Sequence, residues 1–390
     1  MSDLNSLEIS LVNPPNLQLR EPNAFIPLGL AYLGSSLIKQ GFKNTRVDNL
    51  IEKKEINMKH ADIFGIYYPS NSKDKIIKIS KYIRQNFPES KIILGGPHPT
   101  VAPLETMKTT NPDTVVGGEA ELFLPKLVKK FQRGIYDAGI IRNLDCLPFP
   151  ARHLFEKKAV VNETGIHGSY KPSTTVITSR GCPYKCSFCC KNHDMYIKFR
   201  YRSAENVFLE LKELVASYGI EHVKFIDDCF TLIPQRVKKI CEYTKKLGIT
   251  FVCTTRADQT TDKILHYLKQ GGCTTVSIGV ESASPRLINL MNKNETVQQM
   301  KKCIINAKKI GLKTKVFLQY GLPTETDEDI NLTLSFLKDT KPEEYRLSKF
   351  TPLNGSEWEI FLEEKMGSFY PDDDIERSKL MEKINCVLDI

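Results

Sequence analysis

Three cysteines with the spacing C-x3-C-x2-C stand in one short segment of the sequence. They are Cys182, Cys186 and Cys189, and they follow the apolar run 174–178. Thiolates this close together can converge on one metal centre. On a cubane of four irons, three cysteines leave one iron without a protein ligand, whereas four cysteines give a closed electron carrier. The spacing therefore predicts an iron–sulfur centre whose open iron can bind a substrate.

Other interpretations of this segment stay open. A zinc site would need a fourth cysteine or histidine, and Cys190 and His193 lie nearby. A disulfide is less favoured, because the chain opens with neither a basic stretch nor an apolar signal segment that would indicate export. We therefore expect a reducing, cytoplasmic location in which the remaining cysteines are small buried residues. These are Cys146, Cys190, Cys229, Cys241, Cys253, Cys273, Cys303 and Cys386.

The bulk composition is that of a globular protein. At 390 residues the chain is long enough for two or three domains. Its 41% hydrophobic and 26% charged residues are ordinary values, and no apolar run approaches the ~20 residues of a membrane helix. The net charge of +9 comes from lysines spread along the chain. A solvated surface explains them better than a nucleic-acid partner, because no patch of interleaved basic and aromatic residues occurs.

The first third of the chain alternates strand-like and helix-like segments. Each apolar run ends in glycine or proline turns, and a helical pattern follows. This alternation predicts an α/β domain with a doubly wound, Rossmann-like parallel sheet, whose ligands bind at the carboxyl ends of the strands. The expected strands are residues 8–12, 63–68, 92–94 and 114–116, and the expected helices are residues 27–40, 73–86 and 122–131.

The rhythm breaks after about residue 131 and resumes at Ser173. From there six strand–helix units follow one another, too few for a closed eight-unit barrel. We expect a partial (β/α)6 TIM barrel with its chemistry at the carboxyl ends of the strands. The expected strands are residues 174–178, 222–226, 250–254, 274–278, 314–320 and 345–349, and the helices are 203–217, 234–246, 297–310 and 327–338. The expected domains are 1–135, a linker 136–172, the barrel 173–350 and a short C-terminal segment 351–390.

The second half resembles the radical S-adenosylmethionine (SAM) superfamily. The cysteine motif with aromatic Phe188 is followed, in order, by the segments 225–230, 277–282 and 320–326 at strand ends. The resemblance implies that these segments surround the cluster and SAM, with Phe188 against the adenine. The implied SAM contacts are Phe188, Asp228, Glu281, Ser282, Gly321 and Pro323.

Plainer roles for the polar residues stay open. Glu281 and Ser282 would otherwise form a surface turn. Asp227 and Asp228 cannot both face one site comfortably, because like charges raise each other's pKa. We expect one of them to face SAM or the substrate and the other to cap a helix. Arg256, after the third barrel strand, is expected to pair with a carboxylate, in the site or in a structural ion pair.

The first domain resembles the cobalamin-binding domain that precedes the barrel in one branch of that superfamily. The matching segments are 13–15, 27–33, 95–100, 117–121 and 147–150. Where related domains carry Asp-x-His-x-x-Gly, this chain has Asn13-Pro14-Pro15, so no histidine is predicted as lower cobalt ligand. The cobalamin contacts expected by position are Tyr68, Ser70, Gly95, Gly96, His98, Gly117 and Glu119. His98 would otherwise be a turn residue.

The resemblance implies a [4Fe–4S] cluster, SAM and cobalamin as cofactors, a small-molecule substrate, and an electron donor such as flavodoxin or ferredoxin. It implies reductive cleavage of SAM to methionine and a 5′-deoxyadenosyl radical that removes a hydrogen atom from the substrate. Cobalamin-dependent methylation of an unactivated carbon is the favoured outcome. The alternatives are cyclisation, dehydration, deoxygenation or epimerisation of a small metabolite by the same radical, or a non-catalytic corrinoid or cluster sensor.

Overall fold

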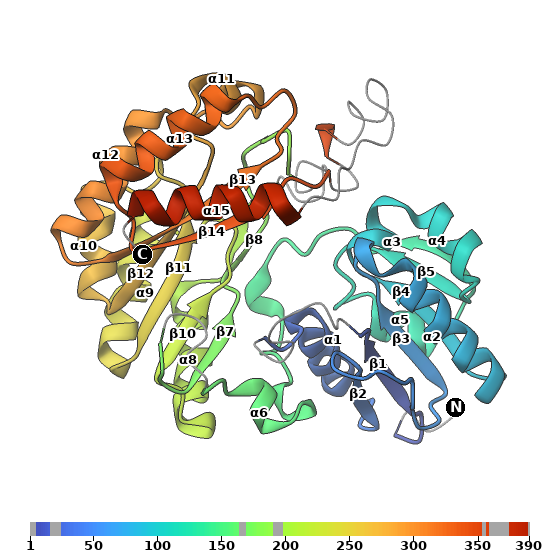
Figure 1. Ribbon diagram of the computed structural model, residues 1–390. Helices are drawn as coiled ribbons and strands as arrows, with labels where there is room; N and C mark the ends of the chain where they lie inside the picture. The colour runs from blue at the N-terminus through green and yellow to red at the C-terminus, as the bar shows by residue number, and fades with distance from the viewer. Residues whose placement is uncertain are drawn as a thin grey trace. The chain divides into compact units, whose positions relative to one another are not determined.

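The computed structural model describes residues 5–15, 25–163, 169–189, 198–352, 356–358 and 374–388. The chain forms two compact units, Met1–Asn162 and Glu163–Ile390. Each unit contains its own parallel sheet of six strands (Figure 1). The α/β fold class expected from the sequence is thereby confirmed, while the finer boundaries 1–135, 136–172, 173–350 and 351–390 stay predictions.

The sheet of the first unit has the strand order β2-β1-β3-β4-β5-β6. The direction in which successive strands are added to the sheet reverses at β1, because β2 lies on one side of β1 and β3 on the other. In open α/β sheets such a switch point forms a crevice at the carboxyl ends of the strands. The strands are β1 (Ile9–Asn13), β2 (Thr45–Asn49), β3 (Ile63–Tyr67), β4 (Lys91–Gly95), β5 (Thr114–Gly117) and β6 (Gly134–Asp137).

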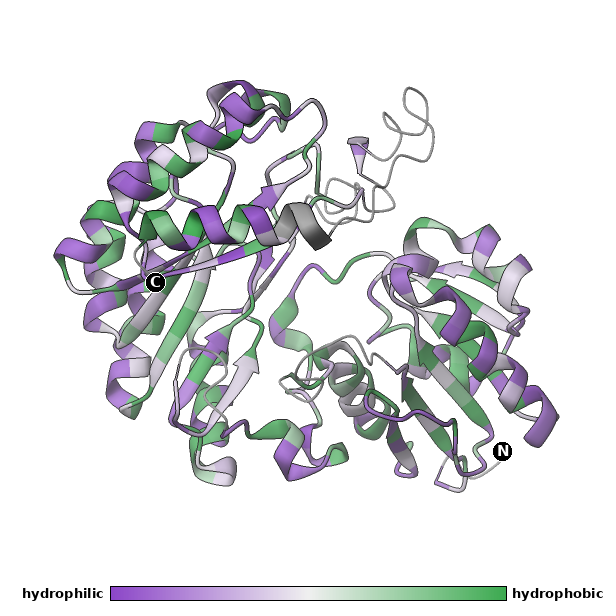
Figure 2. Cartoon of the chain, viewed as in Figure 1, coloured by the Kyte–Doolittle hydropathy of each residue, from purple (hydrophilic) through white to green (hydrophobic). Residues whose placement is uncertain are grey.

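Apolar strands and amphipathic helices form the hydrophobic core of this unit. In α2 (Lys73–Asn86), Ile76, Ile79 and Ile83 recur on one helical face and are fully buried, while the opposite face is lysine-rich. Figure 2 shows the same division, with mainly hydrophobic strands and with helices that carry both hydrophobic and hydrophilic residues. The other helices are α1 (Leu28–Lys39), α3 (Pro97–Val101), α4 (Pro103–Thr110), α5 (Leu124–Lys129) and α6 (Lys157–Val160).

The second unit contains a half-barrel. Its strand order β14-β13-β12-β11-β10-β7 follows the chain, and every pair is parallel. The sheet is open because β7 and β14 are both edges, so the predicted partial (β/α)6 barrel is confirmed. Its strands are β7 (Ser173–Val176), β10 (His222–Phe225), β11 (Thr250–Thr255), β12 (Cys273–Glu281), β13 (Lys313–Tyr320) and β14 (Glu344–Lys349).

Helices cover one face of this half-barrel in a continuous layer (Figure 1). In β13 the residues Thr314, Val316, Leu318 and Tyr320 are buried and alternate with more exposed ones, so the two faces of the sheet differ. We call them the helix face and the inner face. The helices are α8 (Ala204–Tyr218), α9 (Pro234–Leu247), α10 (Asp262–Gln270), α11 (Pro285–Leu290), α12 (Val297–Lys309) and α13 (Asp327–Thr340).

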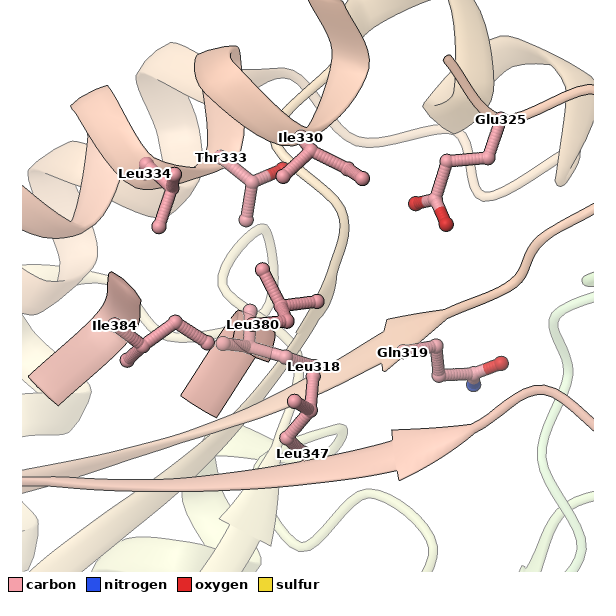
Figure 3. A pocket seen from close by; sticks show the side chains of 9 residues that line it. All are labelled: Leu318, Gln319, Glu325, Ile330, Thr333, Leu334, Leu347, Leu380 and Ile384. Atoms are coloured by element: carbon pink, nitrogen blue, oxygen red, sulfur yellow. The ribbon is translucent and has the colours of Figure 1, made fainter. Parts of the chain in front are cut away.

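A C-terminal helix, α15 (Asp374–Leu388), packs on α13 at the helix face. Figure 3 shows the pocket formed there by β13, β14, α13 and α15. Leu318 and Leu347 point into it from the strands, and Leu380 and Ile384 from α15. Gln319 and Glu325 lie at its polar end. Among the described residues, no helix is both long and apolar enough to cross a membrane.

Asp329 fixes the start of α13. It completes a capping box with Thr326, whose backbone N–H and hydroxyl donate to Asp329 at 2.9 and 2.8 Å. The Ser284 hydroxyl donates to the same carboxylate at 2.5 Å, and Arg286 forms an ion pair with it. These donors hold the pKa of Asp329 well below its usual range against the opposing effect of burial. The carboxylate thus ties α11 to the loop before α13.

We expect Asp329→Asn to lower the free energy of unfolding by about 2 kcal/mol at neutral pH, through loss of charge-assisted hydrogen bonds. Because the folded-state pKa is lowered, the stabilisation is present above the unfolded-state pKa of about 4 and disappears as pH falls. Urea unfolding at a series of pH values should therefore show a shallower acid dependence in the variant. Asp327→Asn, which changes an exposed residue in the same helical turn, serves as the control. Identical behaviour of the two variants would contradict the prediction.

Candidate active site

The residues expected to do chemistry in the second unit lie at one edge of its sheet. The cysteine segment follows β7, Asp228 follows β10, Arg256 follows β11, Glu281 ends β12 and Gly321 follows β13. Because the strands are parallel and neighbouring, their carboxyl ends form a single rim. The fold therefore brings together five segments that are far apart in the sequence.

Asp227 holds the base of the cysteine segment. Its buried carboxylate accepts hydrogen bonds from Thr178 N at 2.6 Å and Ser179 N at 3.2 Å, and from the Thr178 hydroxyl. Arg236 donates to Thr178 O at 2.8 Å. The expectation that one of the paired aspartates caps a helix is wrong for Asp227, because α9 begins after Ile233 and Asp227 is bonded to the cysteine segment instead.

Gly181 lets the chain turn into the motif. Its φ of +81° lies in the left-handed region that favours glycine. Just before it, β8 (Ser179–Arg180) pairs with β9 (Arg200–Tyr201) in a small antiparallel sheet. The turn at Gly181 and the pairing of β8 with β9 therefore fix the backbone just before Cys182.

Arg256 contacts the middle of the cysteine segment. Its Nη1 donates to Cys186 Sγ at 3.7 Å, and its guanidinium carbon lies 3.6 Å from the centre of the Tyr184 ring. This is both a hydrogen bond to a predicted iron ligand and a cation–π contact. The side chain is 9% exposed, so water weakens these interactions little.

Carboxylates on the other side of Arg256 hold it in place. Its Nε donates to Asp258 Oδ1 at 3.0 Å, and its Nη2 donates to the Lys293 carbonyl at 2.7 Å. Glu295, fully buried, lies 3.7 Å from Nη2 and also pairs with the Lys293 amine. The expectation that Arg256 pairs with a carboxylate is confirmed, and the same side chain also contacts the cysteine segment.

The tip of the segment is held from two further sides. Ser187 N donates to Met291 O at 2.9 Å, and Asn292 Nδ2 donates to Lys185 O at 2.9 Å. Trp358 N donates to Ser187 O at 3.2 Å. The loop after α11 and the residues after β14 therefore both clamp the stretch between Cys182 and Cys189.

The three thiols fit an iron–sulfur cluster. Cys186 is buried, Cys182 and Cys189 are partly buried, and none of the three forms a disulfide within the described part of the chain. Burial raises the pKa of Cys182 to about 11 and also raises that of Cys186, which nearby Arg256 and Lys293 oppose. Iron binding would displace these protons, and the cations would offset the resulting negative charge.

No three metal-binding side chains among the described residues lie close enough for a single ion. A cluster differs from such a site because each cysteine binds a separate iron. Cys190 and His193, the candidates for a fourth zinc ligand, lie outside the described residues.

Glu281 has a left-handed backbone conformation, which is uncommon for glutamate. Its φ is +64°, and the pairing of β12 with β13 skips a residue between Gly279 and Glu281. A Cβ on Gly279 would lie 2.8 Å from Glu281 Oε1, so glycine makes room for the carboxylate. Burial raises the pKa of Glu281, while Lys293 and a 2.9 Å hydrogen bond from Gln319 lower it. A strained, partly buried carboxylate at a strand end is typical of functional sites.

The other expected SAM residues have varied surroundings. Asp228 raises the pKa of Cys182, so it lies near that thiol. The Phe188 ring is 6.4 Å from that of Trp358. Gly321 has a φ of +70° and its N–H donates to Glu325, and Pro323 is buried in the same turn. Ser282 is buried with its hydroxyl 3.4 Å from that of Thr333 in α13. Their contacts with SAM stay predictions.

In the first unit, Tyr68 and His98 pack together where β3 and β4 end. Their rings lie 4.4 Å apart, and both side chains are buried. His98 Nε2 is 3.6 Å from Glu105, whose pKa is lowered by Lys73. The Tyr68 hydroxyl is buried and lacks a hydrogen-bond partner within the described part of the chain. Such a group near a switch-point crevice is one that a bound ligand can satisfy, so the residues present fit a cofactor site.

The other residues expected to contact cobalamin follow β3, β4 and β5 at the same edge. Ser70 follows β3 in a short 3-10 turn. Gly96 has a φ of +118°, and a Cβ there would lie 2.9 Å from the Tyr67 ring, whereas Gly95 and Gly117 would meet only ordinary contacts. Glu119 accepts a hydrogen bond from Ile141 N at 2.7 Å, which fixes the segment after β6.

The sequence did not indicate several residues of the rim. Tyr184 stands inside the cysteine motif and Asp258 two residues after Arg256, so a search for partners of Arg256 could have found both. Lys293 and Glu295 follow a helix rather than a strand, and no local pattern marks them. Their role follows only from the three-dimensional contacts.

Trp358 is the single tryptophan of the chain and reports on this site. It is 5% exposed, and its backbone N–H donates to Ser187, which lies between Cys186 and Cys189. We expect assembly of an iron–sulfur cluster to reduce tryptophan fluorescence strongly, because the cluster absorbs in the range of the emission. Chelation of the iron should restore it, and Cys186→Ala protein should not respond to iron and sulfide. Unchanged emission on loading a verified cluster would contradict the placement of Trp358.

Comparisons with known proteins agree with this geometry. Residues 176–337 match the model of the radical SAM superfamily, and residues 22–128 match that of the B12 binding domain. An uncharacterised methyltransferase of Pyrococcus horikoshii is 32% identical over 369 residues, covering 86% of this chain and 78% of that protein. The anaerobic magnesium-protoporphyrin IX monomethyl ester cyclase of Rubrivivax gelatinosus is 24% identical, over 92% and 72% of the two chains.

The fold is also shared with a solved structure. The radical SAM methyltransferase TsrM from Kitasatospora setae, determined with cobalamin and a [4Fe–4S] cluster, superposes with a TM-score of 0.72 at 16% identity, covering 94% of this chain and 76% of that one.

The chain belongs to the radical SAM superfamily, in the group whose members carry a B12-binding domain before the half-barrel. The sequence-based assignment to this family is thereby confirmed. Family membership implies a [4Fe–4S] cluster with SAM, and cobalamin in the first unit.

Proposed function

We propose that this protein is a cobalamin-dependent radical SAM methyltransferase that methylates an unactivated carbon of a small molecule. The observation that carries the proposal is a B12-binding domain joined to a half-barrel whose rim holds the C-x3-C-x2-C segment, in a chain 32% identical to a protein described as a methyltransferase. The cluster and SAM supply a 5′-deoxyadenosyl radical, and cobalamin supplies a methyl carrier.

The chain's own residues orient these groups. We propose that Cys182, Cys186 and Cys189 bind the cluster, while Asp227 and Arg256 hold their loop in place. SAM is then contacted by the predicted set Phe188, Asp228, Glu281, Ser282, Gly321 and Pro323. Cobalamin is contacted by the predicted set Tyr68, Ser70, Gly95, Gly96, His98, Gly117 and Glu119.

The cellular setting is part of the proposal. Reductive cleavage of SAM needs one electron from outside, so we propose a flavodoxin or ferredoxin as donor. The cysteines that the structure describes form no disulfide, which fits a reducing, cytoplasmic location.

A second function is favoured by a specific relative. The cyclase of Rubrivivax gelatinosus aligns with 92% of this chain, although it is named for ring formation rather than methyl transfer. The alternative is therefore the same radical chemistry without methyl transfer, giving for example cyclisation of a small metabolite.

The test is anaerobic reconstitution with iron, sulfide and cobalamin, followed by SAM and a reductant. We expect 5′-deoxyadenosine, and with the correct substrate equal amounts of S-adenosylhomocysteine and methylated product. A verified four-iron cluster without 5′-deoxyadenosine would overturn the proposal. Turnover of substrate without S-adenosylhomocysteine would favour the second function.

A further inference from the structure

The chain leaves the half-barrel after β7 and returns to it before α8, and the three predicted iron ligands lie between these two points. Where the chain leaves and returns, its backbone is in contact. Arg202 N donates to Thr178 O at 2.9 Å, and β8 pairs with β9 next to this bond. Arg202 Nη1 donates to Ile177 O at 3.0 Å, although the two residues are 25 positions apart in the sequence. We call residues 177–180 and 200–202 the loop base.

One side chain from α9 joins the two halves of the loop base. Arg236 Nη2 donates to Thr178 O at 2.8 Å, and its Nε donates to Arg202 O at 2.8 Å. The guanidinium carbon also lies 5.5 Å from the centre of the Tyr201 ring. Arg236 is 6% exposed, so water weakens these hydrogen bonds little. The forked donors of a single arginine therefore hold the departing and the returning segment together.

Two buried carboxylates complete the loop base. Asp227 accepts a hydrogen bond from Thr178 N at 2.6 Å, and Arg236 donates to the carbonyl of the same residue. Burial raises the pKa of Asp227, and the nearby charge of Arg236 opposes this rise. Arg202 forms a buried ion pair with Glu210 of α8, which packs against α9. All these partners belong to the half-barrel itself, so the contacts do not require iron.

A closed base changes what iron has to order. Bringing the two ends of a flexible loop together costs entropy that increases with the length of the loop. Without other contacts, metal binding would have to supply this ordering, because metal binding is then coupled to folding. Here protein contacts already join the two ends. The cysteines are therefore confined near one another before any metal binds, which favours binding by preorganisation.

We propose that Arg236 is a positioning residue for the cluster: it closes the loop base in the iron-free protein and so presents Cys182, Cys186 and Cys189 for cluster assembly. This inference rests on the proposed function only in taking the three cysteines as iron ligands. Arg236 donates to backbone carbonyls of the loop base, whereas Arg256 donates to a cysteine sulfur. Arg236 should therefore affect how firmly the iron is held and leave the reduction potential unchanged.

Amide hydrogen exchange of the iron-free, full-length protein tests the closure directly. In the wild-type protein the amides of Thr178 and Arg202 should be protected, because both are hydrogen-bonded within the loop base. Arg236→Met should accelerate their exchange about tenfold, since two buried hydrogen bonds are lost and Asp227 loses a nearby positive charge. Arg236→Lys should have a smaller effect, because it keeps the charge but not the forked donors.

Iron release from the cluster-loaded protein is the second readout. An excess of chelator should remove iron from Arg236→Met about tenfold faster than from the wild-type protein. The reduction potential, followed by electron paramagnetic resonance, should not change. Arg286→Met is the control, because it breaks an ion pair at the start of α13 and leaves the loop base intact. It should keep the wild-type exchange of the loop base and the wild-type rate of iron release.

Three results would overturn the proposal. The first is rapid exchange of both base amides in the iron-free wild-type protein, since iron would then be what closes the loop. The second is wild-type exchange and iron release in the Arg236 variants, and Arg236→Lys gives this answer even where Arg236→Met does not fold. The third is an equal effect in Arg286→Met. These measurements use neither SAM nor turnover, so their failure differs from a lack of 5′-deoxyadenosine, which would overturn the proposed function.

Discussion

Replacing any one of Cys182, Cys186 and Cys189 by alanine should eliminate the cluster and, with it, the cleavage of SAM. Each thiol is predicted to bind a different iron, and two remaining ligands within one short loop do not hold a cubane that already has an open corner. We expect the iron content to fall from about four atoms per chain to near zero after anaerobic reconstitution. The formation of 5′-deoxyadenosine should fall to background. Iron analysis, Mössbauer spectroscopy and product chromatography measure these outcomes.

Cys229 supplies a matched control for this experiment. It is a fully buried thiol that influences the pKa of Cys182, so it lies close to the predicted ligands. Its own contacts are with the hydroxyls of Thr231 and Thr255, at 4.0 and 3.8 Å. Cys229→Ala should therefore retain the cluster. Loss of iron in this variant would point instead to a fourth cysteine ligand and a closed cluster, and full turnover in any of the three loop variants would refute the ligand assignment.

Arg256→Met should destabilise the second unit and lower the reduction potential of the cluster. Removing one partner from a buried ion pair typically costs about 3–5 kcal/mol, because the remaining charges are left uncompensated. Here Asp258 and Glu295 would lose that partner. A positive charge beside Cys186 favours the reduced, more negative cluster. Losing ~1.4 kcal/mol of this interaction would lower a one-electron potential by about 60 mV.

Thermal unfolding and potentiometry followed by electron paramagnetic resonance measure these two effects separately. Arg256→Lys keeps the charge but loses the forked donors and the stacking on Tyr184. It should therefore be destabilised while shifting the potential less than Arg256→Met. Arg286→Met breaks the ion pair with Asp329 at the start of α13, and should lower stability without moving the potential. A folded, fully loaded Arg256→Met protein with an unchanged potential would show that the contact with Cys186 is only structural.

Local patterns predicted most of the secondary structure because apolar runs, glycine turns and helical spacing act over a few residues. The expected helix at 73–86 coincides with α2, and the expected strand at 314–320 lies within β13. Two strands of the first sheet, β2 and β6, were not expected. Their sequences, TRVDN and GIYD, are partly polar and lie at the two edges of the sheet, where only one side is paired and burial is incomplete.

The same distinction between local and long-range features holds for the residues of the candidate active site. The cysteine spacing and the strand-end motifs could be identified in the sequence, since ligands from one loop are close along the chain. Contacts between segments that are distant along the chain could not be identified from the sequence. Lys293 and Glu295 follow α11 yet support Arg256 after β11, and Trp358 reaches the cysteine segment from beyond β14.

The sequence alone thus determined the family, the order of the strand–helix units and the three predicted iron ligands, because each depends on residues that are neighbours in the chain. Only the tertiary structure decided what surrounds those ligands and which side chains share the inner face. Glu295 lies 3.7 Å from Arg256, although the two residues are 39 positions apart in the sequence. Pleat direction and register, which arise only when the strands pair, decide on which face each side chain lies.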